Sequence, residues 1–173
     1  MQIKKHVLAV LVENEFGALA RIVELFSARG YNIETLTVAP VSRDKKMSRI
    51  TITTYGTDKT IDLICKLLKR IVPVHHAAEL STTEGYIERE LALVQIIADA
   101  ETREKAMRAL ENYRADIVDI DGDSLVFEVI GNSQTVDEVL TKMESYGLAT
   151  VSRTGIAAGF KGAKRLDKLD NED

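Results

Sequence analysis

The segment 11–39, LVENEFGALARIVELFSARGYNIETLTVA, decides the fold of this chain. An apolar run at 7–12 stops at the polar turn ENEFG, residues 13–17. Apolar residues at helical spacing follow the turn: Leu19, Ile22, Val23 and Phe26. Gly30 accepts a positive φ, so the helix should end there, and a second strand should begin at Asn32. The segment therefore predicts a strand, a turn, a helix and another strand.

The chemistry of this turn favours a receptor for a small zwitterion. A helix that begins at Gly17 points its first N–H groups at whatever lies over the turn, and a carboxylate fits there. Gly17 also lets a ligand approach the backbone closely. Asn14 and Asn32 each offer a carbonyl and an amide, so an α-amino group and an α-carboxylate could both be bound. The alternative is structural, because Asn14 and Gly17 also suit an Asx-type turn at a helix entry.

The rest of the first 80 residues repeats the alternation of strands and helices. A pair of strands is expected at 35–38 and 48–55, the segment GTD at 56–58 should cap a second helix, and 74–80 should form a fourth strand. The predicted order is βαββαβ. The polar segment 81–85, STTEG, has no periodicity and predicts a domain boundary.

The same order returns after this boundary. Strands are expected at 91–98, 116–120, 124–130 and 148–156. Helices are expected at 101–113 and after a cap at Ser133 or Thr135. The fold class is therefore α+β, with two ferredoxin-like βαββαβ domains at 1–80 and 86–158. The tail at 159–173 is charged, contains glycine and is predicted to be disordered.

Composition and charge exclude several classes of function. The net charge of −4 leaves no basic surplus to neutralise phosphates, so nucleic-acid binding is not expected. No apolar run approaches the roughly 20 residues that span a bilayer, so we expect a cytoplasmic protein without a membrane partner. The single cysteine, Cys65, lies on the apolar face of a predicted helix and should be a core residue rather than a nucleophile.

Groups that would carry catalysis or bind a metal do not form a pattern in this sequence. His75 and His76 are adjacent and His6 stands alone, so no helical spacing brings two imidazoles together on a metal. Phosphate-binding glycine loops and a nucleophile elbow are also missing from the sequence. We therefore predict no catalytic residue, no metal site and a sensing or regulatory function.

A four-stranded sheet with both helices on one face leaves its other face and its edge strands to be covered. A second copy of the same domain is the commonest cover, so we expect a homodimer. The loop from Asn14 to Gly17 would then lie at the seam between the subunits, where a ligand could act on quaternary structure.

Several blocks of sequence resemble those of one family. The runs 13–21, ENEFGALAR, and 25–38, LFSARGYNIETLTV, are similar to the signature of the small, regulatory subunit of acetohydroxyacid synthase (acetolactate synthase), which carries an N-terminal ACT domain. Further blocks resemble family motifs in the same order: SRITI at 48–52, ERELAL at 88–93 and RTG at 153–155. The resemblance covers residues 3–158.

This resemblance implies a definite function. The family's small subunit binds and activates a large, thiamine-diphosphate-dependent catalytic subunit and confers feedback inhibition by valine. Its effector site would fall here on Asn14, Gly17 and Ala18, with Asn32 and Ile33 supplied by the partner subunit. The domain at 86–158 would dock onto the catalytic subunit. Thiamine diphosphate, magnesium and flavin would belong to that subunit, so no cofactor is expected in this chain.

Two other functions remain possible at this level. The first is a free-standing ACT-type sensor of amino acids that acts on a transporter or a transcription apparatus, and the second is an enzyme built on a ferredoxin-like scaffold. Phe16 and Thr35 depart from the residues usual in the family, and both departures bear on which effector side chain is preferred.

Overall fold

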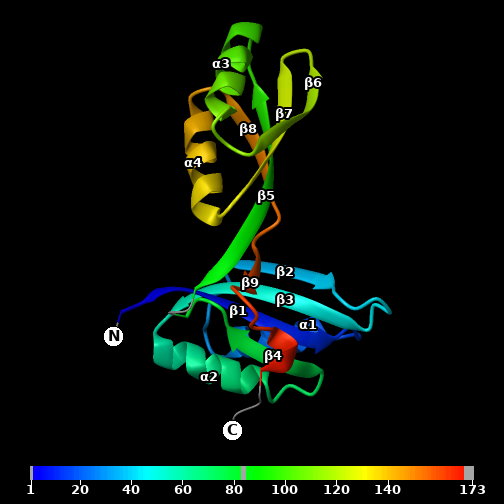
Figure 1. Cartoon of the computed structure of the whole chain (residues 1–173). Coiled ribbons are helices and arrows are strands. Elements are labelled where there is room, and N and C mark those ends of the chain that lie inside the picture. The colour runs from blue at the N-terminus through cyan, green and yellow to red at the C-terminus, as the bar shows by residue number, and fades with distance from the viewer. Residues whose placement is uncertain (1, 83–84, 170–173) are drawn as a thin grey trace. The chain divides into compact units, whose positions relative to one another are not determined.

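The computed structural model of the protein describes residues 2–82 and 85–169. The chain divides into two compact units, one formed by Met1–Ile87 with Ala157–Asp173 and the other by Glu88–Ile156 (Figure 1). The expected boundary segment 81–85 includes residues 83 and 84, which lie outside the described residues. No helix in the described ranges is long and apolar enough to cross a bilayer.

The first unit has the expected βαββαβ order. Its elements are β1 (Lys4–Glu13), α1 (Ala18–Ala28), β2 (Thr35–Pro40), β3 (Met47–Gly56), α2 (Asp58–Leu68) and β4 (Val74–Glu79). The strands pair antiparallel in the order β2-β3-β1-β4, so β2 and β4 are the edge strands. The predicted α+β class with ferredoxin-like topology is therefore confirmed for this unit.

The core of the first unit lies between the sheet and its two helices. Because side chains alternate along a strand, Leu8 and Val10 of β1 share a face with their partners Ile52 and Ile50 of β3. The helices contribute an apolar stripe to this core: Ala18, Ile22, Phe26, Ile61, Ile64 and Leu68. All these side chains are buried, so the helix-facing side of the sheet is dry.

The end of α1 follows the predicted pattern. Gly30 has φ +68° and stands in the left-handed region that favours glycine. The N–H of Gly30 donates to the carbonyl of Ser27 at 3.1 Å and that of Tyr31 to the carbonyl of Phe26 at 2.9 Å. These two bonds form a Schellman motif, which ends the helix and turns the chain toward β2.

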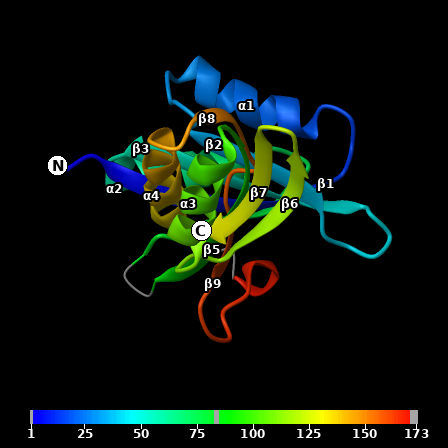
Figure 2. The same cartoon turned by 90° about the horizontal axis from the view of Figure 1, so that it is seen from above.

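The expectation of disorder from Gly159 onward is wrong for residues 159–169. Strand β9 (Ala157–Phe160) and the 3-10 helix η1 (Leu166–Lys168) belong to the first unit, and η1 contacts β1 and β4. Figure 2 shows η1, in red, on the side of this unit opposite α1. Leu166 is only 6% exposed. One buried leucine therefore anchors a segment whose charged composition predicted no structure; residues 170–173 lie outside the described ranges.

The second unit repeats the βαββαβ order, with helices on one side of its sheet (Figure 1). Its elements are β5 (Tyr86–Ile97), α3 (Ala100–Leu110), β6 (Ala115–Asp121), β7 (Ser124–Gly131), α4 (Ser133–Glu144) and β8 (Leu148–Arg153). The strand order is β6-β7-β5-β8. The expected caps of α4, Ser133 or Thr135, are corrected to Asn132, whose side chain accepts from the N–H of Thr135 at 2.8 Å.

A buried ion pair ties the two ends of the second unit together. Glu90 on β5 has a side chain that is 1% exposed, and Arg153 at the end of β8 donates to both of its carboxylate oxygens at 2.7 and 2.9 Å. Arg153 also donates to Asp137 of α4 at 2.7 Å. The hydrogen bonds with Glu90 raise the pKa of the Arg153 guanidinium, which stays charged throughout the accessible pH range.

Removing the arginine should destabilise the second unit. In Arg153→Met the carboxylate of Glu90 stays buried without its partner, which costs about 2 kcal/mol after allowance for the solvent access of Arg153. Hydrogen exchange resolved by mass spectrometry should therefore speed up about 30-fold in the core of residues 88–156. Peptides from the first unit should be unaffected.

Arg108→Met is the matched control for this variant. It breaks an exposed pair between Arg108 and Glu104, with 2.8 Å between nitrogen and oxygen, on α3 of the same unit. Exposed pairs at this spacing contribute about 0.3–0.5 kcal/mol, so exchange should change less than threefold. Equal effects of the two variants would show that burial of Glu90 has no energetic consequence.

Candidate functional site

The turn between β1 and α1 has a backbone that is open at one point. Gly17 stands in the left-handed region at φ +82° and ψ −7°, and α1 has no side-chain cap at this end. A Cβ atom built on Gly17 would meet nothing within 4 Å. The N–H groups of Leu19 and Ala20 find no acceptor among the described residues. The turn therefore presents unused donors and the positive end of the helix dipole to open space.

Asn14 is fixed by the loop between β2 and β3. Its backbone N–H donates to the carbonyl of Lys46 at 2.7 Å, and its Nδ2 donates to the carbonyl of Lys45 at 2.9 Å. The second bond orients the carboxamide, because only the nitrogen can donate to a carbonyl. Its Oδ1 accepts no hydrogen bond from any described residue and so remains available to an ammonium group.

Ala18 and its neighbours support the turn. Ala18 is 4% exposed, and its N–H makes a long hydrogen bond of 3.3 Å to the carbonyl of Glu15. The carboxylate of Glu15 accepts from Arg21 at 3.2 Å across the first turn of the helix. Phe16 points entirely into solvent. The predicted residues Asn14, Gly17 and Ala18 therefore form one local feature at the start of α1.

Asn32 and Ile33 lie at the other end of α1. Asn32 donates from Nδ2 to Glu34 at 2.6 Å, and its backbone carbonyl accepts from Thr54 at 2.6 Å. Ile33 is half-buried and packs against the first core. A helix of 11 residues separates the two groups, which is roughly 16 Å along its axis. One chain does not bring the five predicted residues together, so the site as predicted requires a second copy.

A cavity in the first unit was not predicted from the sequence. It has a volume of about 540 Å³ and lies between the helix-free face of the sheet and the segment that contains β9 and η1. Arg49 of β3, Arg165 and Leu166 are among its lining residues. The only sign of this cavity in the sequence was Arg49, an arginine within a strand of apolar and threonine residues. Its other wall could not be predicted, because that wall comes from residues that were expected to be disordered.

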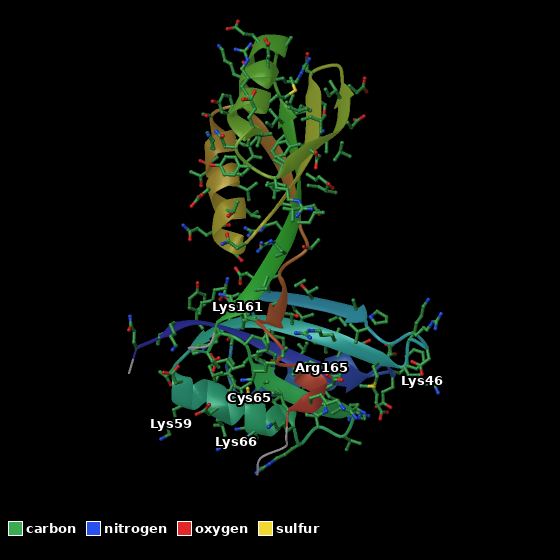
Figure 3. All side chains as sticks on the ribbon, viewed as in Figure 1. Lys46, Lys59, Cys65, Lys66, Lys161 and Arg165 are labelled. Carbon is green, nitrogen blue, oxygen red and sulfur yellow. The ribbon has the colours of Figure 1, made fainter. Side chains whose placement is uncertain are left out.

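Histidine and cysteine have ordinary structural surroundings. Within residues 2–82 and 85–169, no three His, Cys, Asp or Glu side chains are grouped to hold a metal. His6 is fully buried, donates from Nε2 to the carbonyl of Gly56 at 3.1 Å and has its Nδ1 2.6 Å from Glu79. Cys65 lies on the side of α2 that faces the sheet, whereas Lys59 and Lys66 point away from it (Figure 3).

The arrangement of the chain is that of an ACT-type regulatory protein. Residues 8–76 match a family model described as an AHAS small subunit-like ACT domain. Residues 89–159 match a second model, described as the small subunit of acetolactate synthase. Each match falls on one of the two βαββαβ repeats, so both halves indicate the same kind of protein.

Whole-chain similarities agree with these matches. The chain is 40% identical over 161 residues to a protein of Archaeoglobus fulgidus named "Probable acetolactate synthase small subunit", covering 93% of this chain and 99% of that one. It is 38% identical to the isozyme 3 small subunit of Salmonella typhimurium, with coverage of 92% and 98%. A crystal structure of the small subunit from Thermotoga maritima matches with a TM-score of 0.82 at 29% identity, covering 90% of this chain and 96% of that one.

The chain therefore belongs to the family of acetolactate synthase small subunits. These are the regulatory chains of an enzyme of branched-chain amino-acid biosynthesis, and they associate with its large subunit. Catalysis, which depends on thiamine diphosphate, resides in the large subunit. The alternative hypotheses of an independent enzyme and of a free-standing sensor do not fit this membership.

The environment of Cys65 gives a prediction about its reactivity. Burial raises the pKa of the thiol to about 12, against about 8.5 in an unfolded chain. At pH 8.5 the native thiolate is then roughly a thousandfold scarcer, so alkylation by iodoacetamide should be slower by that factor than in guanidinium chloride. Because the unfolded thiol loses its proton first, the free energy of unfolding should fall as pH rises from about 8.5 toward 12. Similar alkylation rates in the two states would contradict this assignment.

Proposed function

We propose that this chain confers feedback inhibition by valine on the large subunit of acetolactate synthase, and that it also activates that subunit. The observation that carries the proposal is the open turn at Gly17, in a chain of the small-subunit family. Unused N–H groups at the start of α1 suit the α-carboxylate of an amino acid. The Oδ1 atom of Asn14 suits its α-ammonium group.

The complete effector site in this proposal lies between two copies of the chain. Strand β2 is an edge strand, and the first unit exposes apolar side chains on β2 and on the outer side of α1: Leu19, Val23 and Val38. Antiparallel pairing of two β2 strands about a two-fold axis would cover this edge. The start of one β2 would then lie opposite the end of the other.

This pairing would also assemble the five predicted residues. Asn32 and Ile33 precede the start of β2, while Asn14 is bonded to the loop that follows the end of β2. In an antiparallel dimer, Asn32 and Ile33 of one copy would approach Asn14, Gly17 and Ala18 of the other. A ligand between them would then bind differently to different quaternary states, which is what feedback control requires.

The second unit, in this proposal, contacts and activates the large subunit. Its edge strand β6 is exposed along almost its whole length and carries the apolar side chains Ile117, Val118 and Ile120. An exposed apolar edge of this kind is costly in an isolated protein and suits a partner. The two units would thus divide sensing and docking between them.

Melting of the full chain with added amino acids tests the effector. Valine at about a hundred times its dissociation constant should stabilise the native state by roughly 2.7 kcal/mol and raise Tm by several degrees. The change in Tm is also measured with leucine and isoleucine at millimolar concentration, which have related branched side chains. Serine and phenylalanine, whose side chains differ from that of valine, are the controls. A rise with none of them, also in the presence of the large subunit, would contradict the effector site.

Gly17→Asp should abolish the response to valine while preserving the fold. The new carboxylate would lie where the effector's carboxylate binds, and the Cβ atom that carries it meets nothing within 4 Å in the free chain. Strain at positive φ should cost about 1–2 kcal/mol. Isothermal titration and inhibition of the reconstituted enzyme should both show a loss of valine binding of at least 100-fold.

Gly122→Asp is the matched control for this variant. Gly122 has φ +52°, and a Cβ atom added there also meets nothing within 4 Å, but it lies in the β6–β7 hairpin. It should bind valine like the unaltered chain, with similar strain and the same added charge. Unchanged valine binding in Gly17→Asp, or equal losses in both variants, would overturn the assignment of the site.

A further inference from the structure

The cavity beneath the C-terminal segment has the size of a ligand site. Its volume of about 540 Å³ lies within the range of roughly 300–1,000 Å³ typical of small-molecule pockets. One wall is the helix-free face of the sheet, where Leu11 of β1 pairs with Arg49 of β3. The facing wall is formed by Phe160 at the end of β9 and Leu166 of η1.

Most of the lining is apolar. Leu11 and Met47 contribute from the sheet, and Val41 contributes from the start of the loop between β2 and β3. Phe160 and Leu166 close the opposite side. An aliphatic chain of a few carbons would be covered by these side chains, and its transfer from water would favour binding.

Arg49 contributes to the cavity a positive charge that no carboxylate among the described residues neutralises. Its guanidinium is half-buried and donates from Nη2 to the backbone carbonyl of Ala158 at 2.6 Å. Among the described residues it makes no ion pair, and burial lowers its pKa. A partly desolvated guanidinium favours an anion, and its planar fork matches a carboxylate or a phosphate.

The remaining charges of the cavity keep it positive. Arg165, labelled in Figure 3, is paired with Asp167 at 3.0 and 2.6 Å. The ammonium of Lys164 lies 5.1 Å from the centre of the Phe160 ring. Of the described residues that line this cavity, Arg49, Lys164 and Arg165 are cationic and Asp167 is anionic, in a chain whose net charge is −4. The local field therefore attracts anions to a surface of an otherwise acidic protein.

We infer that this cavity binds a small amphiphilic anion. A carboxylate or phosphate head pairs with the guanidinium of Arg49, and a short aliphatic body lies among Leu11, Met47 and Leu166. This site is distinct from the effector turn, because its lining residues Leu11 and Arg49 lie on the face of the sheet opposite the helices. The loop between β2 and β3 borders both, through Val41 at the cavity and through Lys45 and Lys46 at Asn14.

Titration of the full chain with three six-carbon probes tests the inference. Hexanoate carries a carboxylate, hexyl phosphate carries a phosphate and hexanamide is a neutral analogue of hexanoate. Methyl NMR signals of Met47 and Leu166 report on the cavity. Hexanoate or hexyl phosphate should shift them saturably with an affinity at least tenfold higher than that of hexanamide, and the tighter of the two identifies the head group.

Two variants and one control assign the contacts. Arg49→Gln should reduce the preference for the anion over hexanamide at least tenfold, whereas Arg70→Gln, an exposed arginine beyond α2, should leave it unchanged. Val41→Trp should fill the cavity and weaken all three probes, which keeps the test decisive if Arg49→Gln folds poorly. Equal affinity for hexanoate, hexyl phosphate and hexanamide, or no saturable shift at Met47 and Leu166, overturns the inference.

This test is independent of the proposed regulation by valine. Loss of valine binding in Gly17→Asp concerns the turn before α1, whereas the probes report on the opposite face of the sheet. Gly17→Asp should therefore bind hexanoate like the unaltered chain. A loss of both responses in that variant would show that the cavity is not a separate site.

Discussion

The antiparallel pairing of β1 with β3 is the constraint on which the first unit depends. Ten residue pairs, from Lys4 with Gly56 to Glu13 with Met47, fix which side chains share a face. Leu8 and Val10 therefore lie on the face of the sheet that packs against the helices, and Leu11 and Arg49 lie on the opposite face. A shift of one residue would exchange the two sets, so core formation and the chemistry of the free face are decided together.

The sequence predicted those parts of the fold that depend on local periodicity. Strands, helices and the βαββαβ order followed from apolar spacing, and Gly30 marked the end of α1 because its left-handed conformation is a local property. The residues of the open turn were likewise readable, since Asn14 and Gly17 act through the backbone beside them. That Asn32 lies at the far end of α1 also follows from chain order alone.

The parts that were missed depend on contacts between distant residues. Leu166 stands in a charged segment and becomes buried only because η1 meets β1 and β4, more than 80 residues earlier in the chain. Local composition contains no information about that surface, so the segment was predicted to be disordered. The cavity shares this origin, because one of its walls did not exist in the prediction. Asn132 was missed for a smaller reason: two neighbouring residues, Ser133 and Thr135, were equally good candidates for the cap.

Two arginines of this chain show how burial and pairing separate structural from binding roles. Arg153 meets a carboxylate that is 1% exposed through two hydrogen bonds, so its charge is satisfied within the fold and its place in the second unit is structural. Arg49 is half-buried, and the partner given by the structure is a neutral carbonyl. Desolvation of a cation is offset most fully by an opposite charge or by water, and only in part by a neutral acceptor. A cavity of ligand size with apolar walls lies beside Arg49. The cost of desolvating a guanidinium is offset within the fold at Arg153, whereas at Arg49 the same cost favours binding of an anion in the cavity.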